Sequence, residues 1–65
     1  MKLYIKWRYP DEIEPKDHEH TFFDINPKKI NISFGILYFE SFEDPQNKNW
    51  TFPLSHIVKM HMEEE

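Results

Sequence analysis

The histidines of this chain, set among twelve carboxylates, are the residues whose types could do chemistry. His18, Glu19 and His20 are consecutive, and imidazole with carboxylate is a ligand set that zinc or nickel accepts. If this stretch is extended, the two imidazoles point the same way and could share a metal ion. His56 and His61 have no set relation to them, so the spacing favours ordinary surface histidines and we expect no metal site.

The groups that an activated catalytic centre needs do not stand out in the sequence. There is no cysteine and no glycine-rich phosphate loop, and Ser33, Ser41 and Ser55 have no nucleophile-elbow context. The carboxylates fall in loops and at the C-terminus, where water solvates them and their acidity is hard to tune. A chain of 65 residues also has little volume with which to enclose a pocket. We therefore expect no enzymatic activity and no cofactor.

Acidic residues form the most distinctive pattern, with five of them in residues 11–19, three in residues 40–44 and a run at residues 63–65. If these segments converge, they make a negative field that attracts a basic or nucleic-acid-binding partner. Phe42, and with it Ile13, would supply apolar anchors. The alternative is that the acids are scattered for solubility. The candidate partner-binding residues are Glu12, Glu14, Asp17, Glu19, Phe42, Glu43 and Asp44.

A second candidate surface is basic and aromatic. Lys2, Tyr4, Lys6 and Arg8 alternate along the N-terminal segment, and small β-barrels use such faces to stack bases and contact phosphates. The formal net charge of −4 opposes this nucleic-acid hypothesis, because phosphate neutralisation supplies most non-specific affinity. The other interpretation is a solvated edge whose lysines prevent strand pairing.

The length allows one domain, residues 1–65, with a single core of marginal size. Without cysteine no disulfide can stabilise this core. We expect the large buried area of the eleven aromatic side chains to compensate for its small size, and we expect a homodimer. The absence of cysteine favours the cytoplasm. No stretch is apolar and long enough for a signal peptide or a membrane span.

The elements that position these residues are predicted to be strands. Residues 1–9 alternate apolar and polar side chains, as a half-buried strand does, whereas residues 11–19 read as an exposed loop. Residues 21–25 are a short β-prone run before the Asn26-Pro27 turn. Residues 30–39 predict one long strand, with Gly35 marking a bulge or a close approach.

The second half predicts a hairpin and a last strand. Residues 43–49 are a polar turn, residues 50–52 the return strand that Pro53 ends, and residues 54–56 a single turn. Residues 57–62 form the final strand, with Val58, Met60 and Met62 inward. The expected fold is mainly β: a small curved antiparallel sheet, or an SH3-like or OB-like barrel, of four to five strands with at most one short helical turn. An α+β fold with a short helix near Pro27 is the alternative.

The segment from Trp50 to Ile57, Trp-Thr-Phe-Pro-Leu-Ser-His-Ile, with its flanking strands, resembles the small orphan β proteins of phages and prophages from low-GC bacteria. The absence of alanine beside seven Ile and seven Lys fits an AT-rich genome. The resemblance implies a compact accessory protein, often oligomeric, that binds a host or defence protein. We therefore expect a small protein-binding module that modulates or inhibits such a partner.

Overall fold

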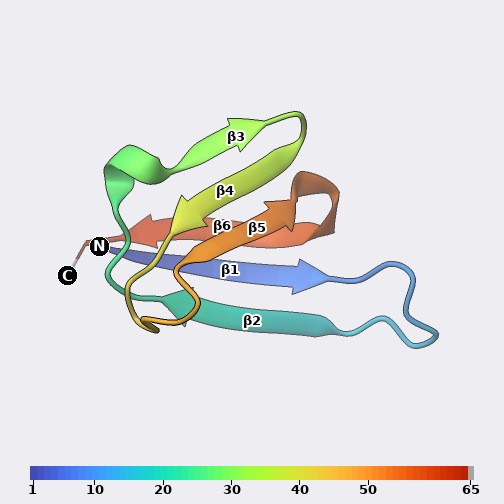
Figure 1. Cartoon of the computed structure of the whole chain (residues 1–65). Coiled ribbons are helices and arrows are strands. Elements are labelled where there is room, and N and C mark those ends of the chain that lie inside the picture. Colours follow the sequence, from blue (N-terminus) through green and yellow to red (C-terminus); the bar gives the residue numbers. More distant parts are fainter. Residues whose placement is uncertain (65) are drawn as a thin grey trace.

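The structure, a computed structural model, describes residues 1–64, and they form six strands and two short 3-10 turns (Figure 1). The strands divide between two three-stranded antiparallel sheets. The second sheet lies across one face of the first, here called its inner face (Figure 1). No helix within residues 1–64 is long and apolar enough to cross a membrane.

The first sheet has the N-terminal strand at its centre, in the order β2-β1-β6. Leu3 is opposite Phe22 on one side and Met62 on the other, and Ile5 is opposite His20 and Met60. The period-2 alternation of β1 therefore turns its apolar residues to the inner face and its basic residues outward. The strands are β1 (Lys2–Arg8), β2 (Asp17–Phe22) and β6 (Ile57–Glu63).

The second sheet has the order β3-β4-β5. Leu37 at its centre is opposite Ile32 and Phe52, and Phe39 is opposite Trp50. These side chains lie on the face turned to the first sheet. The strands are β3 (Asn31–Ser33), β4 (Ile36–Glu40) and β5 (Asn49–Pro53).

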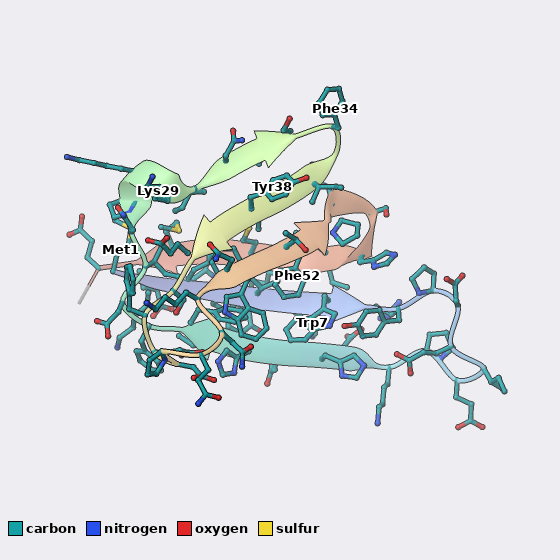
Figure 2. All side chains as sticks on the ribbon, in the orientation of Figure 1. Met1, Trp7, Lys29, Phe34, Tyr38 and Phe52 are labelled. Carbon is teal, nitrogen blue, oxygen red and sulfur yellow. The ribbon has the colours of Figure 1, made fainter. Side chains whose placement is uncertain are left out.

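Aromatic rings fill most of the space between the sheets. Phe22 makes edge contacts with Phe39 at 4.9 Å and Phe52 at 6.1 Å between ring centroids. Figure 2 shows Trp7 and Phe52 between the two sheets, with their rings 5.0 Å apart. Such pairs add to the gain from burial alone. The buried core is Leu3, Ile5, Phe22, Ile25, Leu37, Phe39 and Phe52.

Two 3-10 turns connect the sheets. η1 (Pro27–Lys29) begins after Asn26, whose side chain accepts a hydrogen bond from the Lys28 N–H, and proline suits its first position. η2 (Leu54–His56) follows β5, and the Leu54 N–H donates to the Gly35 carbonyl at 2.8 Å. The second turn thereby ties the start of β6 to the β3–β4 hairpin.

The mainly β class is confirmed, but three finer expectations are wrong. Residues 1–64 form six strands instead of four to five, two stacked sheets instead of one curved sheet or closed barrel, and two 3-10 turns instead of at most one. A closed barrel would need hydrogen bonds between the sheets along their edges, and β2, β6, β3 and β5 each pair on one side only.

Two segments were misassigned. Residues 17–19, expected in a loop, belong to β2, and the expected long strand over residues 30–39 is two strands. A two-residue turn interrupts it at Phe34 and Gly35, whose φ angles of 53° and 71° are those of a type I′ hairpin. Gly35 thus supplies a positive φ in a turn and not a bulge within a strand.

The expected strands at residues 50–52 and 57–62 are confirmed as β5 and β6. Met60 and Met62 face inward but stay half-exposed, because the second sheet does not cover them. Val58 lies where the register shifts opposite Lys6 and Trp7, and it is also exposed. The expected acidic tail begins within β6 at Glu63, and its last residue, Glu65, lies outside the described residues.

Candidate functional site

A groove of about 480 Å³ runs between β2 and the β4–β5 loop, residues 41–48. β2 is an edge strand, so the inner-facing side chains of His18 and His20 border the groove and remain partly exposed. The loop brings Glu43 and Asp44 to the opposite side. The groove combines ring faces, imidazoles and carboxylates within one surface feature.

Aromatic rings make the apolar wall of the groove. Trp7 stacks on His18 with ring centroids 5.7 Å apart, and Phe22 packs on Trp50 at 4.9 Å. The Trp50 indole N–H donates to the Asn47 carbonyl at 3.0 Å, which fixes that ring against the loop. The Trp7 Nε1 atom is buried and has no hydrogen-bond partner among residues 1–64.

Glu43 joins the loop to β2. One carboxylate oxygen is 2.8 Å from Nε2 of His20, and the other accepts the Phe23 N–H at 3.2 Å. Ser41, fully buried, donates its hydroxyl to the Phe23 carbonyl at 2.6 Å, and its Oγ accepts the Glu43 N–H at 3.5 Å. The loop is therefore held in place by side chains of its own.

Asp44 accepts hydrogen bonds from the turn that it starts. Its two oxygens accept hydrogen bonds from the Gln46 N–H at 2.9 Å and from the Asn47 side-chain amide at 3.1 Å. These hydrogen bonds, the first above all, lower the pKa of Asp44. The carboxylate therefore carries its negative charge at the groove down to acidic pH.

The acidic residues singled out from the sequence do not form one surface. Glu43 and Asp44 line the groove, and Phe42 is exposed in the same loop, with Lys48 Nζ 5.9 Å from its ring centroid. Glu12 and Glu14 lie in the β1–β2 loop, which reaches the opposite end of the molecule (Figure 1). Glu12 there contacts His18 Nε2 at 3.2 Å. The carboxylates of Asp17 and Glu19 contact Arg8 and Tyr4 on the outer face, and Glu19 is also one of the residues that line the groove.

The basic stripe of β1 lies on the outer face of the first sheet, as its alternation predicts, but β2 sets carboxylates beside it. Asp17 is 2.7 Å from Arg8 and 3.4 Å from Lys6, and Arg8 lowers the pKa of Asp17. Glu19 accepts the hydroxyl of Tyr4 at 2.7 Å, which raises the pKa of Tyr4. Lys2 faces Glu63 across the β1–β6 ladder. The stripe is locally neutralised.

The four histidines do not gather at one site, and each contacts a different carboxylate or aromatic side chain. His18 and His20 do share one face of an extended strand, the arrangement that a shared metal ion would need, but each contacts its own carboxylate. His56 lies edge-on to Tyr9, and His61 stacks on Tyr4 at 4.8 Å on the outer face. Within residues 1–64 no three His, Cys, Asp or Glu side chains gather where they could hold a metal ion.

Four groove residues were not considered as site residues in the sequence analysis: Trp7, Phe22, Asn47 and Trp50. Trp7 was assigned to the core, and Trp50 to the return strand. The available signal was the run His18-x-His20-x-Phe22, whose alternation with polar residues matches a strand that carries rings on one face. In the structure this strand sets His18 opposite Trp7 and His20 opposite Ile5.

Comparisons with protein-family models, curated proteins and solved structures find no significant match to this chain.

Proposed function

We propose that this chain is a protein-binding module that holds a basic segment of a partner protein in the groove. The observation that carries the proposal is that two fixed carboxylates, Glu43 and Asp44, stand beside the rings of Trp7 and Trp50 in one open groove. Lysine and arginine side chains suit such a site, because their stems pack on rings while their cations pair with carboxylates.

The groove residues are ordered before any partner binds. Glu43, Asp44 and Trp50 are each fixed by hydrogen bonds within the free chain. Pre-ordered side chains lose little entropy on association, which favours affinity from a small contact. The volume of about 480 Å³ falls within the range of roughly 300–1,000 Å³ that ligand sites occupy. It accommodates a few side chains of a segment and no folded domain.

The overall charge supports a basic partner over a nucleic acid. A net charge of −4 speeds the association of a cationic segment and slows that of a polyanion. The one face that carries a basic stripe has Asp17 and Glu19 within it. For the biological setting we propose the modulation or inhibition of a host or defence protein, an idea that rests on the resemblance to phage proteins.

The two tryptophans of the chain, Trp7 and Trp50, both line the groove, so intrinsic fluorescence reports on it directly. We expect a decapeptide of alternating lysine and serine to change this fluorescence with a micromolar dissociation constant. Asp44→Asn should weaken binding about tenfold, because it removes one of the two carboxylates that would pair with the cations of the peptide. Glu14→Gln is the matched control, because it removes the same charge from the β1–β2 loop.

Four outcomes would contradict the proposal. The lysine peptide gives no fluorescence change, or it binds no better than a decapeptide of alternating glutamate and serine. Glu14→Gln weakens binding as much as Asp44→Asn, which would mean a general field and not a groove. Labelled oligonucleotides bind with micromolar affinity and a steep salt dependence, which would favour the nucleic-acid alternative on Tyr4, Lys6 and Arg8.

A further inference from the structure

The free edge of β6 is the most exposed apolar feature of the first sheet. β6 has seven residues and pairs only with β1, so its other edge presents unpaired backbone groups. Met60 and Met62 on its inner face are 39% and 43% exposed. A long, exposed, apolar strand edge is a template for pairing with another strand.

The other sheet edges are less suited to pairing. β2 carries Asp17, His18, Glu19 and His20 in succession, a charged pattern that discourages association. β3 has three residues, and β5 ends at Pro53, which has no N–H to donate. On β6 the register shift next to Ile57 confines regular pairing to its later residues.

A second copy of β6 fits this edge with complementary side chains. In a two-fold antiparallel pair centred on His61, Lys59 lies opposite Glu63 of the other copy, and Met60 opposite Met62 of the other copy. Each pairing occurs twice, with the charges on the outer face and the methionines on the inner face. Opposite charges and apolar pairs directly across a ladder stabilise it, by about 0.2–1 kcal/mol each.

Neighbouring registers match less well. Centring on Met60 places Lys59 opposite His61, and centring on Met62 places Met60 opposite Glu64. Within one copy, Lys59 already faces Lys6 of β1, so a carboxylate on its other side relieves a like-charge contact. Glu63 accepts from His61 through one oxygen, at 2.8 Å, and a carboxylate has lone pairs for a second donor.

We infer that two copies of this chain associate through β6 in the register centred on His61, which joins two first sheets into one continuous six-stranded sheet. The partner is a second copy because the edge complements itself in charge and in apolar pattern. Pairing covers methionines that a domain of 65 residues cannot cover alone, and small domains often gain stability in this way.

Sedimentation equilibrium over micromolar to sub-millimolar concentrations tests the inference. We expect wild type to show a monomer–dimer equilibrium, and Lys59→Glu and Glu63→Lys each to weaken the dimer at least tenfold. The double variant K59E/E63K restores opposite charges across the interface and should recover the dimer. Lys16→Glu and Glu14→Lys, which make the same charge changes in the β1–β2 loop, are the controls. Circular dichroism confirms that each variant is folded.

A wild type that stays monomeric at every concentration would overturn the inference. So would a dimer that survives Lys59→Glu unchanged, or one that the double variant fails to restore, since either result rules out this register. The peptide titration of the groove is independent of all these measurements, because the groove lies on the β2 side and the proposed interface on the opposite edge.

Discussion

Asp17 sets the charge balance of the outer face of the first sheet. Its carboxylate contacts Arg8 at 2.7 Å and Lys6 at 3.4 Å, so one acid serves two cations of the neighbouring strand. All three side chains are partly exposed, and pairs of this kind contribute little to stability. Their effect is on the field of that face, which would otherwise present an uninterrupted cationic stripe.

The Arg8–Asp17 pair makes stability depend on pH in a defined direction. Arg8, and after it Lys6, lowers the pKa of Asp17 below the ordinary 3.8. A carboxyl with a lower pKa in the folded than in the unfolded state stabilises the fold above the unfolded value and loses that contribution as the pH falls through the folded value. We expect Arg8→Gln to raise the pKa of Asp17 towards 3.8, as measured by NMR titration of its carboxyl carbon.

The control for this prediction is Lys29→Gln, which removes a cation from η1 and leaves the outer face intact. It should leave the titration of Asp17 unchanged. As the pH is lowered below about 4, the free energy of unfolding of the Arg8→Gln variant, measured with denaturant, should fall less than that of wild type. An Asp17 that titrates identically in both variants would show that Arg8 is not its partner in solution.

Among the elements, the β3–β4 hairpin has the least favourable local sequence. Phe34 is fully exposed, with a φ of 53°, and Figure 2 shows its ring projecting from the tip. A left-handed backbone costs a non-glycine residue roughly 1–2 kcal/mol, and type I′ turns prefer Asn-Gly. We expect Phe34→Asn to stabilise the fold by about 1 kcal/mol, measured by urea unfolding followed by tryptophan fluorescence.

Phe34→Leu is the comparison for the hairpin, because leucine keeps an apolar side chain without asparagine's tolerance of a positive φ. Its unfolding midpoint should stay close to that of wild type. Gly35→Val should be destabilising at the adjacent position, where nothing lies within 4 Å of an added Cβ and the backbone angle alone is the obstacle. A Phe34→Asn variant less stable than wild type would mean that the Phe34 side chain has a structural role.

The same hairpin shows why the sequence predicted some elements and not others. Strands with one apolar face, β1, β5 and β6, were recognised because their alternation is visible locally. A two-residue turn changes which alternate positions lie on the inner side of the sheet: before the turn it is the position of Ile32, which stays 54% exposed, and after it those of Leu37 and Phe39. In a single uninterrupted strand, Ile32 would therefore lie on one face and Leu37 and Phe39 on the other, which is how the sequence was interpreted.

β2 and the groove were hidden for a different reason. β2 is polar over most of its length, because its outer face meets the cations of β1 and its inner face carries two histidines at an open groove before the buried Phe22, so it lacks the apolar alternation of a core strand. Glu43 and Asp44 could be picked out as loop acids, but their neighbours depend on the strand register and on the anchoring of the loop by Ser41. Such contacts between distant segments leave no local pattern.

The molecule as a whole has two incompletely covered flanks. One is the groove beside β2, and the other is the β6 edge with its half-exposed methionines. Both arise because three strands of the second sheet, one of them with three residues, do not span the full inner face of the first. A larger core would have closed these flanks, so the two proposed binding surfaces both follow from the small size of the chain.

Because the core is small, truncating a single side chain at its centre should strongly destabilise the fold. The adjacent residues Phe22 and Phe23 provide a matched test. Phe22 is 1% exposed and contacts rings of the second sheet, whereas Phe23 is 43% exposed and has Lys2 over its ring. We expect Phe22→Ala to remove roughly 3–5 kcal/mol and Phe23→Ala about 1 kcal/mol or less.

A domain of 65 residues has a total stability of roughly 3–10 kcal/mol, so the loss at Phe22 is comparable with the whole. Thermal unfolding followed by circular dichroism should therefore show Phe22→Ala largely unfolded near body temperature and Phe23→Ala folded, because only the first change opens a cavity where the two sheets meet. Equal midpoints for the two variants would mean that the sheets are held together by contacts other than the aromatic core.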